Sequence, residues 1–223
     1  MSVNALKLFC LSLLLLLSSC AHQQVDQQVE MAAPSFPGGS LTEALAEKKA
    51  VTDLEALFSI VFEKSDATIM GDGALTISKT GDMSLRVYSM GFLAMELTSK
   101  DRTVKSSPRL DPDRTLILTE GLRDCLFWWN PGNDTITEDN GHYRIRGADR
   151  EVWLDRASFL PIRQTVSLPD GKELRIFYDN PARGNKVWYQ SRIRIELDSY
   201  AVTLLVRDIS VKNSRPDCIY CSL

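Results

Sequence analysis

The 223-residue sequence has only two histidines, and 29 acidic residues balance its 26 basic ones, for a formal net charge of −3. It has no basic block, zinc-finger spacing or aromatic-basic motif, so nucleic acid is not expected as a partner. It also lacks a Gly-x-Ser-x-Gly elbow, a His-x-x-x-His pair and a phosphate-binding glycine loop. These absences argue against an enzyme, and no metal or cofactor is expected.

The apolar run near the start is too short to cross a membrane. Lys7 precedes residues 8–17, a run of ten that suits a secretory signal, whereas a membrane span needs about 20. The run ends in Leu17-Ser18-Ser19-Cys20, which resembles the lipobox of bacterial lipoproteins. The resemblance implies a signal peptide over residues 1–19 and lipidation of Cys20, which would become the mature N-terminus. The alternative is an ordinary signal peptide in which Cys20 is incidental.

Residues 20–40 predict a flexible tether, because their polar, Pro- and Gly-containing sequence cannot bury enough apolar surface to become ordered. Acyl chains on Cys20 would anchor the protein to membrane lipid without spanning the bilayer. Residue 21 is Ala rather than Asp. By resemblance to enterobacterial lipoproteins, in which Asp at this place retains the protein at the inner membrane, we expect the outer membrane, with the domain facing the periplasm.

Three cysteines remain once Cys10 leaves with the signal and Cys20 is acylated. Export permits disulfides, and the spacing of Cys218 and Cys221 in the tail, residues 214–223, favours a bridge between them. Free or intermolecular thiols and a redox role are the alternatives. A redox C-x-x-C motif needs a following helix to lower the thiol pKa, and the chain ends too soon after Cys221 for one.

Residues 41–213 predict one domain that is mainly β. Ser40-Leu41-Thr42-Glu43 is typical of a helix start, and apolar residues up to Phe62 recur at helical spacing, which predicts a long N-terminal helix. Asp111-Pro112 predicts the start of a helical insertion that ends before Pro131 and that Gly121 weakens in its middle. Alternation predicts strands over residues 67–78, 83–90, 92–99, 102–106, 135–138, 143–147, 151–155, 162–168, 173–179, 187–197 and 201–211.

An antiparallel sheet of about eleven strands must curl or close. The expected fold class is therefore α+β: a curled sheet forming an incomplete barrel, with the N-terminal helix and the helical insertion as a lid. We expect Trp128 and Trp129 to diverge, since neighbours on a helix are about 100° apart and cannot both face one core. One of the two rings then lines a cavity mouth or a membrane interface, unless both serve ordinary core and rim packing.

Two segments resemble LolB-type outer-membrane lipoproteins of the LolA/LolB-like superfamily. Residues 85–97, LRVYSMGFLAMEL, are similar to the place where one strand of that family ends in a Pro-Leu-Gly loop and the next begins. Residues 122–134, LRDCLFWWNPGND, are similar to the family's helix and the turn after it. Ser89 and Met90 replace the Pro and the Leu of the loop, and the helical insertion is shorter.

The resemblance implies a cavity between sheet and helices that binds the acyl chains of lipoproteins or other envelope lipids, for carriage or insertion at the outer membrane. It implies a periplasmic carrier or envelope complex as partner, and membrane contact at Met90, with Phe92 beside it; the alternative is a hairpin whose side chains pack in the core. The expected ligand-binding residues are Leu57, Phe58, Val61, Leu85, Val87, Leu93, Met95 and Trp128. The competing hypothesis is an envelope scaffold or stress-sensing subunit of the same fold without lipid cargo.

Overall fold

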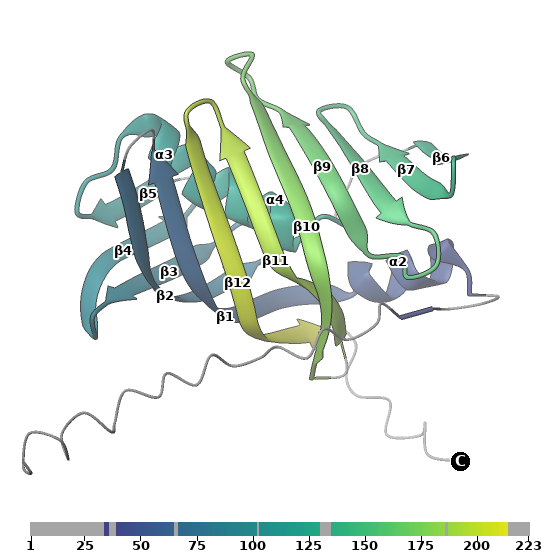
Figure 1. The fold of residues 1–223 in the computed structure, drawn as a ribbon, viewed down its shortest axis with the longest axis horizontal. Coiled ribbons are helices and arrows are strands. Elements are labelled where there is room, and N and C mark those ends of the chain that lie inside the picture. The colour runs from purple at the N-terminus through teal and green to yellow at the C-terminus, as the bar shows by residue number, and fades with distance from the viewer. Residues whose placement is uncertain are drawn as a thin grey trace, which may run out of the picture. The chain divides into compact units, whose positions relative to one another are not determined.

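A single curled sheet carries most of the chain in the computed structural model (Figure 1). The structure describes residues 34–35, 39–64, 67–101, 103–129, 135–185 and 187–213. The predicted signal peptide, the lipidation site Cys20 and the possible disulfide between Cys218 and Cys221 lie outside the described residues, so they stay predictions.

The described residues form twelve strands in the order β5-β4-β3-β2-β1-β12-β11-β10-β9-β8-β7-β6. The strands are β1 (Val51–Lys64), β2 (Ala67–Ser78), β3 (Met83–Ser89), β4 (Phe92–Lys100), β5 (Thr103–Ser107), β6 (Thr135–Asp139), β7 (His142–Arg146), β8 (Arg150–Asp155), β9 (Pro161–Ser167), β10 (Glu173–Gly184), β11 (Val187–Leu197) and β12 (Tyr200–Asn213). All neighbouring pairs are antiparallel, and β5 and β6 form the two open edges. The predicted α+β class and incomplete barrel are confirmed, with one strand more than expected.

The additional strand is β1, where the sequence predicted that the N-terminal helix continues. α2 (Leu41–Lys49) begins after Ser40 as predicted, although the Ser40 side chain makes no capping hydrogen bond, and it ends just before β1. Leu54, Phe58 and Phe62 have helical spacing, but apolar residues also fill the even positions between them, so the run alternates. The segment lies in the centre of the sheet, where pairing with both β2 and β12 stabilises the strand over the helix.

The helical insertion lies inside the curl of the sheet (Figure 1). It consists of α3 (Pro112–Leu116), a π-helical segment η2 (Ile117–Gly121) and α4 (Leu122–Leu126), so the helix is interrupted where it was expected to be weak. The Asp111 carboxylate caps α3 by accepting the backbone N–H of Arg114 at 2.9 Å. A Cβ at Gly121 would stand 3.0 Å from Cγ2 of Ile195, so glycine lets the insertion approach β11 closely.

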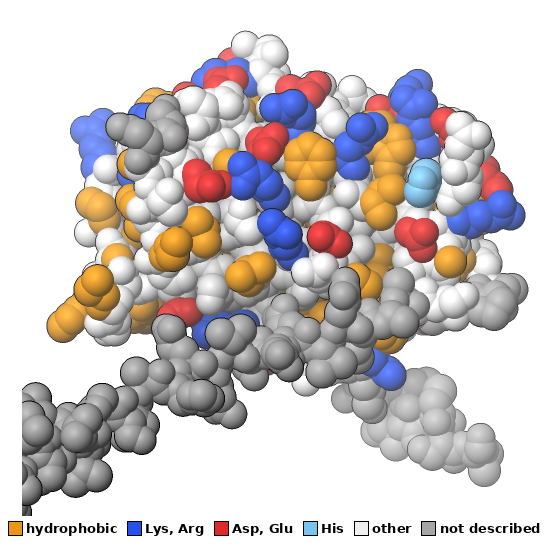
Figure 2. Space-filling view, viewed as in Figure 1, with side chains coloured by type: hydrophobic (Ala, Val, Ile, Leu, Met, Phe, Trp, Pro, Cys, Tyr) orange, Lys and Arg blue, Asp and Glu red, His pale blue; other side chains and the backbone are white. Residues whose placement is uncertain are grey.

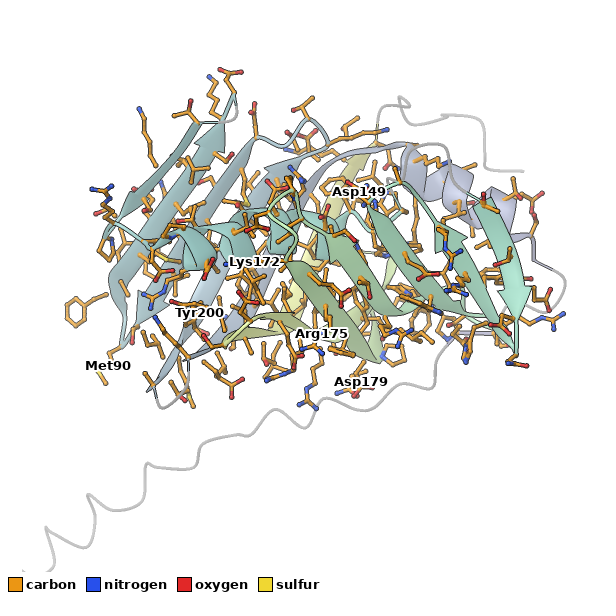
Figure 3. The ribbon with its side chains drawn as sticks, turned by 90° about the horizontal axis from the view of Figure 1, so that it is seen from above. Met90, Asp149, Lys172, Arg175, Asp179 and Tyr200 are labelled. Carbon is orange, nitrogen blue, oxygen red and sulfur yellow. The ribbon has the colours of Figure 1, made fainter. Side chains whose placement is uncertain are left out.

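Polar contacts tie the insertion to the strands that curl around it (Figure 3). The hydroxyl of Tyr200 donates to Asp111 at 3.2 Å, and the ammonium of Lys172 lies 2.5 Å from Asp113 and 3.2 Å from Asp198. These partly exposed ion pairs stabilise the fold modestly, because solvent screens them. None of the described helices is long and apolar enough to span a membrane.

Candidate functional site

The concave face of the sheet is filled by the protein's own side chains. Phe58, Leu85, Val87 and Trp128 lie there as predicted, each less than 10% exposed, and the half-buried Met95 packs against the same core. The cavity that remains between α4 and strands β10–β12 measures about 30 Å³. We call it the inner cavity; it has room for about one water molecule. These five residues therefore line a packed core rather than an open concavity.

The other three predicted ligand-binding residues lie on the opposite face, so their placement in the concavity was wrong. Leu57 and Val61 alternate with Phe58 along β1, and Leu57 is 50% exposed. A helix over this segment would place Leu57 and Val61 on the same face as Phe58. In a strand, neighbouring side chains point to opposite faces. Leu93 is displaced by a bulge in β4: Val87 pairs with Met95, but the next residue of β3, Tyr88, pairs with Leu93.

Trp128 and Trp129 are both buried, so the expectation that they cannot share one core was wrong. α4 ends at Leu126, and Phe127 leaves the helical conformation with φ −108° and ψ 37°. Beyond the helix end the two rings turn inward together and meet edge to face, with their centroids 5.5 Å apart.

An open apolar pocket of about 500 Å³ lies between α2, the loop 158–160 and the ends of β1, β10, β11 and β12. We call it the α2 pocket. Its apolar lining consists of Ala44, Val51, Trp129, Phe159, Leu160, Val187, Trp188 and Val211. It shares Trp129, Val187, Trp188 and Val211 with the inner cavity, so the two spaces adjoin. Its volume falls within the roughly 300–1,000 Å³ of small-molecule sites.

A lysine reaches the boundary between the α2 pocket and the inner cavity. Lys48, near the end of α2, lines both spaces and is half-buried. Its ammonium lies 5.0 Å from the ring centroid of Trp129 and 5.9 Å from that of Trp128, within cation–π range. Burial lowers the pKa of Lys48 to about 8, against the opposing effect of the Glu47 charge. Lys48 is therefore mostly charged at neutral pH.

A second hollow, of about 750 Å³, lies between β5 and the outer side of the insertion. It is lined by Val104, Arg109, Leu110, Asp111, Pro112, Thr115, Leu116, Thr119 and Glu120. No aromatic ring lines this hollow, whose sides come from β5, the loop 109–111, α3 and η2. The α2 pocket is the more enclosed by aromatic side chains and therefore the better candidate for an apolar ligand.

The turn between β3 and β4 projects apolar side chains into solvent. Met90 is 95% exposed and Phe92 is 78% exposed, so the alternative that they pack in the core is wrong. Figure 3 shows Met90 at one extremity of the molecule, and Figure 2 shows hydrophobic side chains gathered at the same end. Ile69 and Met70, at the start of β2, are also exposed. We call Ile69, Met70, Met90, Phe92 and Leu93 the hairpin tip.

The described residues offer little that is typical of a catalytic or metal site. Among them, no three His, Cys, Asp or Glu side chains gather closely enough to hold a metal ion. Cys125 is a free, buried thiol whose Sγ donates to the carbonyl of Leu122 at 3.3 Å, and burial raises its pKa well above the usual value. A thiol that stays protonated in this way is a poor nucleophile.

The architecture is similar to that of a LolA superfamily protein from Nitrosomonas europaea, with a TM-score of 0.55, 12% identity, and coverage of 80% of this chain and 96% of that chain. The chain has a LolA/LolB-like fold. A DUF1329 family protein from Desulfovibrio piger is similar too, with a TM-score of 0.54, 8% identity, and coverage of 83% and 96%. No protein-family model and no curated protein matches the sequence. At such identities the likeness shows the fold, and a fold by itself does not assign a cargo.

Within this LolA/LolB-like fold, sequence reasoning singled out Met90 and Phe92 of the hairpin tip, placed Leu93 in the concavity instead, and missed the α2 pocket. The pocket combines one turn of α2, the end of the insertion and the ends of four strands, which are far apart in the sequence. Sequence reasoning assigned no role to Lys48, and it placed Trp188 only at the beginning of the predicted strand 187–197. The one available signal was the run of aromatic residues Trp188 and Tyr189 beside a turn, where side chains are often accessible.

Proposed function

We propose that this protein is a lipid-anchored lipoprotein of the outer membrane that faces the periplasm and binds an acyl chain of a lipoprotein or another envelope lipid in the α2 pocket. The observation that carries the proposal is an open volume of about 500 Å³ walled by Trp129, Trp188 and aliphatic side chains. Burial of apolar area contributes about 25 cal/mol per Å² to binding. Few fixed polar contacts would keep the cargo exchangeable.

The hairpin tip is proposed as the contact with the membrane. Met90 has φ 51° in a two-residue turn with Gly91, a conformation that ordinarily favours Asn, Asp or Gly. The Met90 side chain is 95% exposed, so it does not pack against the rest of the protein. We infer that a methionine occupies this strained position because its side chain inserts into the membrane. Lipid on Cys20 would hold the domain beside the leaflet that the tip enters, where a carrier or envelope complex could hand over cargo.

The proposal is tested by extracting lipid from the protein purified from membranes and by native mass spectrometry. We expect one acyl-bearing molecule per chain in addition to the anchor, and saturable uptake of a fluorescent acyl probe after delipidation. Absence of both co-purifying lipid and probe uptake would exclude acyl-chain binding.

A second function, an envelope scaffold or stress-sensing subunit without lipid cargo, is favoured by the filled concave face. Phe58 and Leu85 are fully buried there, and the inner cavity measures only about 30 Å³. A pulldown from the envelope separates the two functions, because a stoichiometric protein partner without lipid would support the scaffold.

A further inference from the structure

We infer that the α2 pocket selects a single-chain fatty acid, whose carboxylate pairs with the ammonium of Lys48. The inference rests on the proposed acyl-chain binding and names the chemical class of the ligand. The chain of the fatty acid would lie against Ala44, Phe159 and Trp188, and its carboxylate would reach the side of the pocket that adjoins the inner cavity.

The placement of Lys48 differs from that of the next residue on α2. Lys49 is exposed and does not line the pocket, whereas Lys48 lines both the α2 pocket and the inner cavity. A helix turns by about 100° per residue, so only one of two consecutive lysines can point into the same space. The two residues therefore form a natural pair of test and control.

The charge of Lys48 is only partly compensated by the groups that line the pocket, among which the Glu47 charge acts on it. Glu43, Glu47 and Arg183 are the other charged residues there, and neither glutamate is within ion-pair distance of Lys48 among the described contacts. The rings of Trp128 and Trp129 offset part of the cost of burying the charge. A half-buried cation that has no ion-pair partner among the described residues favours an anionic ligand, because pairing removes the remaining cost.

The chemical nature of the ligand's head group follows from the lack of an ion-pair partner for the Lys48 ammonium. The acyl chains of a lipoprotein are held in amides and esters, which carry no charge and would leave the ammonium unpaired. A free carboxylate has the charge and the acceptor oxygens that an ammonium binds best. The pKa of Lys48 is lowered because its apolar surroundings disfavour the charged ammonium. A bound anion would stabilise the charged form.

The test compares dodecanoate with dodecanol, which has the same chain and no charge, in titrations of the mature chain, residues 20–223, carrying Cys20→Ala. Binding is followed by fluorescence of the tryptophans that line the pocket. We expect dodecanoate to bind roughly tenfold to a hundredfold more tightly than dodecanol. Lys48→Met should abolish this preference, Lys48→Arg should retain it, and Lys49→Met should leave it unchanged. Circular dichroism verifies that each variant is folded.

The possible outcomes separate the inference from the function on which it rests. Equal binding of the acid and the alcohol, with no effect of Lys48→Met, would overturn the inference and leave acyl-chain binding intact. Binding of neither ligand would contradict both. Tighter binding of dodecyl phosphate than of dodecanoate would reassign the pocket to a phosphate head group.

Discussion

The hairpin tip and the α2 pocket are apolar regions of opposite shape. At the tip, Met90 and Phe92 stand out from the end of a hairpin, whereas Trp129 and Trp188 in the pocket surround an open space. A projecting apolar group can only enter another apolar phase, while a hollow can only receive an apolar chain. Under the proposed function, membrane contact and ligand binding would therefore use separate parts of the molecule.

The two regions share one property of the backbone. Among the described residues, seven non-glycine residues have positive φ, and five of them are Asn or Asp, which tolerate this conformation. The two exceptions are Met90 at the hairpin tip and Phe159 in the wall of the α2 pocket. Strained backbone positions cluster at functional sites. The positions of Met90 and Phe159 therefore support the hairpin tip and the α2 pocket as the candidate functional regions.

The largest expected effect comes from making the tip polar. Met90→Asp combined with Phe92→Asp should weaken association with phospholipid vesicles roughly tenfold to a hundredfold, because burial of each side chain contributes up to about 1.5–3 kcal/mol. Vesicle flotation of the mature chain, residues 20–223, carrying Cys20→Ala measures this without the acyl anchor or the signal peptide. Uptake of an acyl probe should not change. Asn140→Asp, in the matching turn between β6 and β7, is the control, and equal flotation of all three proteins would refute the membrane role.

Filling the α2 pocket should weaken acyl-probe binding and leave vesicle association unchanged, the reverse of the tip variant. Ala44→Trp places a large ring in the pocket and should weaken acyl-probe binding about tenfold while vesicle association stays the same. Ala46→Trp, on the exposed side of α2, should leave both unchanged. Fluorescence titration measures the affinity. If Ala44→Trp and Ala46→Trp bound the probe equally well, the ligand would have to occupy another part of the molecule.

Lys48→Met should raise the free energy of unfolding by about 1–2 kcal/mol at pH 7, because it removes a charge whose burial is only partly offset by the tryptophan rings. The pKa of Lys48 falls from 10.5 to about 8 on folding. The unfolded state therefore binds more protons between these pH values, and wild-type stability contributed by this group rises with pH across that window.

Denaturant unfolding at pH 7 and pH 10.5 measures the effect. The advantage of Lys48→Met should disappear at the higher pH, where Lys48 is largely neutral in the folded state. Lys49→Met should show no such dependence, since Lys49 is exposed. A stability difference that stays constant with pH would mean that burial does not perturb Lys48.

The smallest expected effect concerns the turn at the hairpin tip. Met90→Asn should raise the free energy of unfolding by about 0.5–1 kcal/mol, because Asn tolerates positive φ better than Met. Asn140→Met, at φ 45° in the matching turn, should lower it by a similar amount. Denaturant unfolding checks both variants. If Met90→Asn stabilises the protein and also weakens vesicle association, then methionine at this position lowers stability and favours membrane contact. Unchanged stability would mean that positive φ at Met90 costs little.

The fold was largely predictable from sequence, because most strands from residue 67 onward alternate between apolar and polar side chains. The exception is β4, where a bulge shifts the alternation and moves Leu93 to the other face. β1 was not predictable, because Leu54, Phe58 and Phe62 satisfy both the helical and the strand period, and only pairing with β2 and β12 decides. The tip could be predicted because a hairpin turn is local. The α2 pocket could not, since it depends on how Trp129 leaves the helix and where α2 packs, and neither is encoded in local spacing.

The occupancy of the α2 pocket by one acyl chain is tested most directly by photo-crosslinking with a diazirine-bearing fatty acid and identification of the labelled residues by mass spectrometry. We expect saturable labelling of Ala44, Trp129 and Trp188, which unlabelled dodecanoate competes away. Labelling of Leu110 and Leu116 in the hollow beside β5, or labelling that does not saturate, would contradict this assignment.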